Sequence, residues 1–194
     1  LFRAATTAPR TAASDEQGRA LFGVGSCLVA ISWIPKSTAT TALAQMAGFK
    51  VGRHDEGVKM LARVAENPLS VRAPLACSVL LIDLLLMPHG IRNAQARREL
   101  AEQLTQRALE RWPRSSTFHW LASAEAKKAG KTDEALRHID EATHECLATD
   151  MFDEVPHALT VEKATLLVLA LMFDAAALLS KQCLASMERA ARPH

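Results

Sequence analysis

The chain has 194 residues, of which 49% are hydrophobic, 23% are charged and 5% are aromatic, and it contains no Tyr. Strands favour β-branched and aromatic residues, so this Ala- and Leu-rich composition excludes an all-β fold and a wholly disordered chain. The formal charge of +2 comes from 23 basic and 21 acidic residues and gives no global field that would attract nucleic acid or a membrane surface. The sequence predicts an all-α fold.

Residues 1–19 form a basic segment rich in Ala, Thr and Ser. The segment contains Arg3, Arg10 and Arg19, and no acidic residue precedes Asp15. This composition is typical of a mitochondrial import signal or its mature remnant, and the alternative is an ordinary disordered tail. We expect an extended N-terminal arm and a mitochondrial location, in the matrix or at the inner membrane.

Residues 20–36 predict an apolar helix. The run 21–35 is uncharged and lies between Arg19 and Lys36. About 16 helical residues span roughly 24 Å, which is less than the roughly 30 Å of a bilayer core. Two alternatives stay open, a marginal membrane span that contacts the inner membrane and a buried helix of the protein. Gly23, Gly25 and Ser26 would let this helix approach a neighbouring helix closely, in lipid or in protein.

An internal repeat with an offset of 78 residues organises the predicted helical domain at 37–190. Gly52, Asp55 and Glu56 align with Gly130, Asp133 and Glu134, and the match continues from Leu61 to Ile139. In each block the Gly ends one helix without a Cβ penalty, and the acidic residues favour the positive end of the next helix. Each block therefore predicts helix, Gly turn, helix.

The repeat resembles the tetratricopeptide repeat, a helix–turn–helix unit. GKTDEALRHIDEA at 130–142 places Gly130, Ala135, Ile139 and Ala142 at the positions of the family pattern, and Ser123 takes a small-residue position in the preceding helix. The resemblance implies a short α-solenoid of antiparallel helix pairs, with a generic α-helical bundle as the competing fold. It covers 38–149.

Two blocks depart from the family pattern. The block at 71–113 is longer than the pattern and holds an apolar helix from Pro74 to Met87 and a basic helix that begins at Ile91. The block at 157–190 has two apolar helices but no Gly turn. The match is therefore specific in one repeat, at 116–149.

Ligands of tetratricopeptide repeats lie along a groove lined by the first helices, and the resemblance transfers four partner-binding positions to this chain. These are Trp120 and Lys127 in the best repeat, and Met46 and Phe49 in the first block. Trp120 and Ala124 cannot hold a carboxylate as the chaperone-tail clamps of the family do. We expect the groove to bury a helix or an extended segment, and the alternative for Trp120 is a place in the core.

The most basic stretch is the predicted helix at 91–114. Its candidate phosphate contacts are Arg92, Arg97, Arg98 and Arg107. Glutamates interrupt the run, which is typical of a solvated face with local ion pairs. Contact with RNA is the alternative, although the missing Tyr weakens base stacking.

Neither a catalytic signature nor a cofactor or metal motif occurs in the sequence. AGKT at 129–132 lacks the earlier Gly of a phosphate-binding loop, and the spacing of His138, His144 and Cys146 does not place them on one helix face. All four cysteines lie in apolar helical patterns, so we expect buried thiols rather than disulfides. They are Cys27, Cys77, Cys146 and Cys183.

Taken together, these features predict a non-catalytic scaffold, an accessory subunit of a large mitochondrial assembly such as a respiratory or ATP synthase complex. It would bind other protein subunits rather than a small-molecule substrate. The alternative function is an RNA-associated mitochondrial ribosomal protein that uses the basic helix at 91–114. An enzyme with an unrecognised helical active site ranks third.

Overall fold

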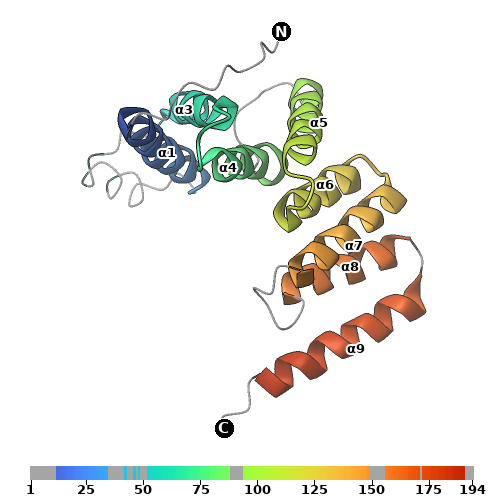
Figure 1. Ribbon diagram of the computed structural model, residues 1–194. Helices are drawn as coiled ribbons and strands as arrows, with labels where there is room; N and C mark the ends of the chain where they lie inside the picture. The colour runs from blue at the N-terminus through green and yellow to red at the C-terminus, as the bar shows by residue number, and fades with distance from the viewer. Residues whose placement is uncertain are drawn as a thin grey trace. The chain divides into compact units, whose positions relative to one another are not determined.

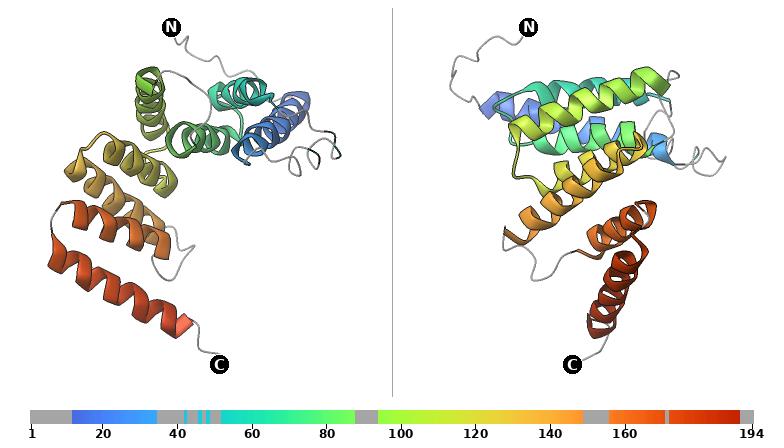
Figure 2. Two further views of the ribbon diagram at one scale, coloured as in Figure 1. Left: turned by 180° about the vertical axis from the view of Figure 1, so that it is seen from behind. Right: turned by 90° about the vertical axis from the view of Figure 1, so that its right-hand side faces the viewer.

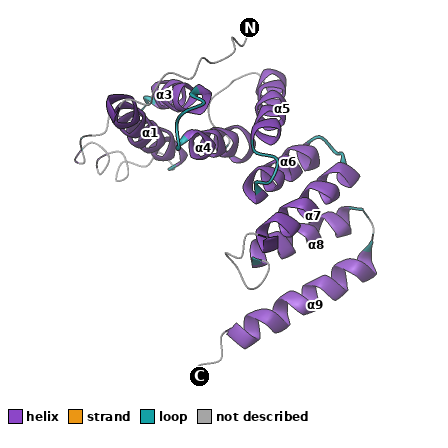
Figure 3. Cartoon of the chain, viewed as in Figure 1, coloured by secondary structure: helices purple, strands orange, loops and turns teal. Residues whose placement is uncertain are grey.

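The computed structural model describes most of the chain, and every element in the described part is an α-helix or a connection between helices (Figure 3). The described residues are 12–34, 42, 46, 48, 52–87, 94–148, 156–170 and 172–190. Sequential helices pack as antiparallel pairs, which confirms the predicted all-α, tetratricopeptide-like fold (Figure 1).

The helices fall into two compact units, residues 1–104 and residues 105–194. Unit 1 contains α1 (Ala12–Trp33), α3 (His54–Glu66), α4 (Ala73–Leu86) and the beginning of α5 (Ala94–Arg111). Unit 2 contains the end of α5 and the helices α6 (Ser116–Lys128), α7 (Thr132–Ala148), α8 (His157–Leu169) and α9 (Phe173–Ala190).

Two glycines let α1 and α3 approach closely in unit 1. A Cβ atom added to Gly57 would lie 2.9 Å from the carbonyl oxygen of Gly25. Val29 of α1 and Leu61 of α3 are fully buried beside this contact and belong to one core cluster with Leu80 of α4. The close approach predicted for Gly25 is confirmed, and it places the apolar part of α1 against α3. The same prediction for Gly23 was wrong, because a Cβ atom added there would meet no atom within 4 Å.

The boundaries of α1 differ from the prediction. The helix begins at Ala12, inside the segment assigned to the N-terminal arm. Ala12 and Ala13 favour helix, and Asp15 and Glu16 favour the positive end of a helix, which explains the earlier start. Among the described helices, none is long and apolar enough to cross a membrane.

Cys27 was predicted to be buried, and this prediction was wrong. Its side chain is exposed, whereas Cys77, Cys146 and Cys183 are buried free thiols as expected. The run 21–33 is apolar all round and therefore carries no pattern that distinguishes its buried face from its exposed face. Leu28 and Val29 face the core, and Cys27 does not.

The internal repeat with an offset of 78 residues is confirmed in α3 and α7. Gly52 and Gly130 both have positive φ, 96° and 76°, immediately before these helices. The Arg53–Glu56 ion pair at the start of α3 recurs as Lys131–Glu134 at the start of α7. The first helix expected in the block at 38–70 lies outside the described residues, apart from a few positions.

Gly130 ends α6 as expected. The N–H of Lys131 donates to the carbonyl of Ala126 at 2.9 Å, and the N–H of Gly130 donates to the carbonyl of Lys127 at 3.0 Å. Together the two bonds form a Schellman motif, which needs the positive φ that Gly adopts without a Cβ penalty. This turn sets the antiparallel α6–α7 pair.

Candidate functional site

The helices α8 and α9 line an open apolar groove in unit 2, which we call the α8–α9 groove. Its volume is about 410 Å³. The helices α8 and α9 lie side by side in all the views (Figures 1 and 2). The lining comes from one face of each helix: Thr160, Val161, Ala164, Thr165, Val168, Ser180, Cys183, Leu184 and Met187.

The surface of the α8–α9 groove is apolar even where its residues are polar. The hydroxyl of Thr165 donates to the carbonyl of Val161 at 2.9 Å, and that of Ser180 donates to the carbonyl of Ala176 at 2.8 Å. Both hydroxyls are thus satisfied within their own helices. A ligand in this groove would meet mainly methyl and methylene groups.

Four large side chains of the groove keep about half of their surface in water. The exposed fractions are 56% for Val161, 46% for Val168, 59% for Leu184 and 49% for Met187. Covering one such side chain gains on the order of 1 kcal/mol, about half of what full burial contributes. A contiguous face of four is therefore a strong candidate for a binding surface.

The helix pairs α6–α7 and α8–α9 repeat the same backbone at a spacing of 41 residues. The N–H of Lys131 donates to the carbonyl of Ala126 at 2.9 Å, and the N–H of Met172 donates to the carbonyl of Leu167 at 2.8 Å. The helix starts repeat as well: the N–H groups of Phe118 and Leu159 donate to the carbonyls three residues earlier. The structure therefore relates each position of α6 and α7 to a position in α8 and α9.

In the α6–α7 pair, the counterpart of the α8–α9 groove is filled by α8. Leu159 and Leu166 of α8 join one core cluster with Ile139 and Ala142 of α7. Leu166 and Ile139 are both fully buried. The first pair thus accepts the next helix of the chain, and that helix completes its core.

Two ion pairs fix the register of α8 on the α6–α7 pair. Glu162 of α8 accepts from the ammonium of Lys127 on α6. Lys163 of α8 lies 2.5 Å from a carboxylate oxygen of Asp140 on α7. Because the four side chains are between 22% and 56% exposed, solvent screens both pairs and they contribute more to register than to stability.

The predicted partner-binding residues divide into three groups. Trp120 and Lys127 lie together on α6: Trp120 is partly buried against the core that α8 completes, and Lys127 pairs with Glu162 of α8. Met46 is 84% exposed. Phe49 lies outside the described residues.

The three candidate phosphate contacts that the structure describes differ in their surroundings. The guanidinium of Arg97 donates to the carbonyl of Leu84 at 2.7 Å and to the carbonyls of Asp83 and Met87, so it binds the unpaired carbonyls at the end of α4. Arg98 and Arg107 are exposed on α5, and Arg92 lies outside the described residues. We correct the assignment of Arg97 to a helix-capping role.

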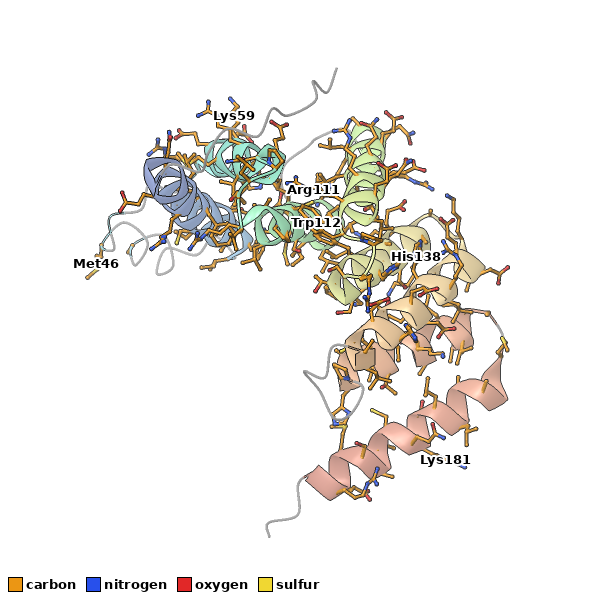
Figure 4. The ribbon with its side chains drawn as sticks, viewed as in Figure 1. Met46, Lys59, Arg111, Trp112, His138 and Lys181 are labelled. Carbon is orange, nitrogen blue, oxygen red and sulfur yellow. The ribbon has the colours of Figure 1, made fainter. Side chains whose placement is uncertain are left out.

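Two histidines form a hydrogen-bonded chain between α6 and α7. Nδ1 of His119 and Nδ1 of His138 are 3.3 Å apart, Arg137 donates to Nε2 of His138 at 3.1 Å, and Nε2 of His119 is 2.9 Å from the carbonyl of Pro113. All these contacts are satisfied when both rings are neutral. Burial, and then the nearby guanidinium of Arg137, lower the pKa of His138 below its ordinary value. Figure 4 shows His138 within unit 2.

A buried carboxylate joins three helices in unit 1. Asp83 of α4, 4% exposed, accepts from the indole N–H of Trp33 on α1 at 2.8 Å and lies 2.9 Å from Nε2 of His54 on α3. This network holds the helices together. Within the described part of the chain, no group of three or more His, Cys, Asp and Glu side chains could hold a metal ion.

Sequence reasoning missed the residues of the α8–α9 groove because the 41-residue repeat is almost invisible in the sequence. Leu171 stands where Gly130 ends α6, and Pro156 stands where Ser115 begins it. The remaining signal is weak: Asp133 and Asp174 match at this spacing. Equal helix lengths, 13 residues for both α6 and α8, are a second clue.

Comparison with known families agrees with this architecture. The sequence model of the Iml2/Tetratricopeptide repeat protein 39 family matches residues 6–190. The chain belongs to this family. No match was found among curated proteins or among solved structures. The family match covers both compact units, and tetratricopeptide-like repeats usually mediate contacts between proteins.

Proposed function

We propose that this family member is a non-catalytic scaffold whose α8–α9 groove binds a helical segment of a partner protein. The observation that carries the proposal is the groove itself, in which Val161, Val168, Leu184 and Met187 are half exposed between two well-formed helices. An apolar groove between helices suits an amphipathic helix, which buries one apolar face and keeps its other face in water.

The chemistry of the groove favours a protein over other ligands. The hydroxyls of Thr165 and Ser180 are bound within their own helices, and the volume of about 410 Å³ is open along two helices rather than enclosed. A small polar substrate would find few hydrogen-bond partners, and phosphate would find no lining cation. The family match brings a repeat domain with no catalytic assignment, which supports a binding role.

We further propose a mitochondrial location, as an accessory subunit of a large assembly. The support is the composition of residues 1–19, which hold Arg3, Arg10 and Arg19 but no acidic residue before Asp15. We expect isolated mitochondria to import the chain in a potential-dependent manner and to lose this import when the three arginines are replaced by Glu. Uptake that is equal for both proteins would contradict the proposed location.

The binding proposal is tested by photo-crosslinking in cells. With benzoylphenylalanine at Leu184, we expect crosslinks to a helical segment of another protein, identified by mass spectrometry of the crosslinked peptide. Val168→Asp should abolish the crosslink because it places an unpaired carboxylate in an apolar contact.

Val71→Asp is the matched control, since Val71 is 65% exposed in unit 1 and lies outside the groove. This variant should keep the crosslink. Loss of the crosslink in both variants, or its survival in Val168→Asp, would contradict the proposal.

A further inference from the structure

We infer that the helix in the α8–α9 groove carries apolar side chains at positions i, i+3 and i+7 and an acidic side chain at i+4. This inference rests on the proposed function and specifies the partner's chemistry. It follows from the internal repeat, because the chain already contains one helix, α8, that occupies the equivalent groove of the preceding pair.

The template is the way α8 contacts the α6–α7 pair. Leu159, Glu162 and Leu166 stand at i, i+3 and i+7, so they lie on one face of α8. Both leucines enter the core cluster, and Glu162 binds Lys127 between them. Lys163 at i+4 binds Asp140 at the rim.

Two substitutions in the 41-residue repeat change what this groove recognises. Val168 replaces Lys127, so the position that bound Glu162 is apolar in the α8–α9 groove. A carboxylate opposite Val168 would lose water without gaining a partner, so the occupant needs an apolar side chain at i+3.

Lys181 replaces Asp140 at the rim. Its side chain is exposed and forms no ion pair with the part of the chain that the structure describes (Figure 4). Asp140 selects Lys at i+4 of α8, and Lys181 therefore selects Asp or Glu at i+4 of the partner helix. The partner helix therefore carries an acidic residue at the position where α8 carries Lys163.

The lining of the groove also sets the size of the apolar side chains. Val161 stands at the position of Trp120 and Ser180 at that of Ile139, so the lining is smaller at these two positions, whereas Leu184 and Met187 are larger than their counterparts Thr143 and Cys146. The open volume of about 410 Å³ accepts Leu, Met or Phe at i and i+7.

Unit 1 repeats the same mode of contact independently. The helix α4 follows the α1–α3 pair and packs on it through Ala76 and Leu80, one turn apart, which join the cluster around Leu61. One turn further, Asp83 lies 2.9 Å from Nε2 of His54 on α3. In both units, the helix that follows a pair thus uses one apolar face and a charged contact.

The test is a specificity swap with two synthetic helical peptides of about four turns. Both peptides carry Leu at i and i+7. The Leu–Glu peptide has Leu at i+3 and Glu at i+4. The Glu–Lys peptide has Glu at i+3 and Lys at i+4, as α8 does. Fluorescence anisotropy with the full chain should show about tenfold tighter binding of the Leu–Glu peptide. The double variant Val168→Lys/Lys181→Asp restores the α6–α7 charges and should reverse the preference.

A reversed preference cannot arise from misfolding, because a misfolded protein would lose both peptides. An unchanged preference in the double variant, or equal affinity for both peptides, would overturn the inference. If neither peptide binds but Val168→Asp still removes the cellular crosslink, the register is wrong and the proposed function stands. If Val168→Asp keeps the crosslink, the proposed function fails.

A second copy of the chain is the competing occupant, since α9 itself presents Leu184, Met187 and Glu188 at positions i, i+3 and i+4 of the required pattern. Sedimentation of the full chain separates the two cases. We expect a monomer. A dimer that Lys181→Glu dissociates and that Lys181→Glu/Glu188→Lys restores would overturn the inference in favour of self-association.

Discussion

The helix pairs α6–α7 and α8–α9 share a backbone but differ in what covers them. Ile139 is fully buried because α8 packs against it, whereas its counterpart Ser180 is exposed; Cys146 is 4% exposed and its counterpart Met187 is 49% exposed. Among the described residues, the exposure of a receiving face therefore depends on what packs against it, and not on the pair itself. The open face of the α8–α9 pair is the surface that we propose for binding a partner helix.

The largest expected effect is a difference in stability between two leucine variants, one at Leu166 in the filled groove and one at Leu184 in the open groove. Leu166→Ala should lower the free energy of unfolding of unit 2 by about 3 kcal/mol, because it leaves a cavity in the α6–α7–α8 core. Leu184→Ala should cost less than about 1 kcal/mol, since the side chain is 59% exposed. Hydrogen exchange of the α7 amides measures both, and equal losses would contradict the comparison.

A second variant closes the open groove. Ser180→Ile copies Ile139, and its larger side chain should occupy space that the partner helix needs. We expect about tenfold weaker binding of the Leu–Glu peptide with no loss of thermal stability. Ser180→Ala is the control and should bind as the wild type does. Unchanged affinity of Ser180→Ile would mean that the peptide binds elsewhere.

The histidine chain predicts a pH dependence that belongs to the α6–α7 pair alone, because Thr160 and Leu179 replace His119 and His138 in α8–α9. The pKa of His138 is lowered by folding, chiefly through burial. The unfolded chain then binds more protons, so stability is lost as the pH falls below about 6.5, the ordinary pKa of His.

Thermal unfolding between pH 8 and pH 5 measures this dependence. His138→Leu copies Leu179 and should flatten the pH profile. A profile that is the same in the wild type and in His138→Leu would show that another group is responsible.

The smallest effect concerns the ion pairs that set the register of α8. A double-mutant cycle on Lys127 and Glu162 should give a coupling free energy of about 0.5 kcal/mol, because both side chains are partly exposed and screened. The cycle on Lys163 and Asp140 should give a similar value. A coupling above about 2 kcal/mol would mean that charge, and not apolar burial, holds α8 in place.

Sequence patterns predicted the local structure where a residue has one physical role. Gly130 ends a helix because it adopts positive φ, and the acidic residues after Gly52 and Gly130 lie in the first turns of α3 and α7. The pattern did not predict the exposed face of α1, since a run that is apolar all round has no polar side, and Cys27 was assigned wrongly.

The candidate site could not be predicted from sequence for a different reason. In the sequence, Arg97 could not be distinguished from a phosphate ligand, because the carbonyls at the end of α4 that it binds are brought near it only by the tertiary fold. The α8–α9 groove depends on a 41-residue repeat in which almost every side chain has changed, and only the backbone hydrogen bonds reveal the equivalence. Whether an apolar helix face is covered is a tertiary property.

The most direct test of the central claim is methyl NMR of the full chain with the Leu–Glu peptide. If the α8–α9 groove accepts a helix as the α6–α7 pair accepts α8, the methyl signals of Val161, Val168, Leu184 and Met187 will shift on titration. The signals of Leu61 and Leu166, buried in the two cores, will stay in place. Saturated binding without shifts in the groove, or with shifts concentrated elsewhere, would contradict the account.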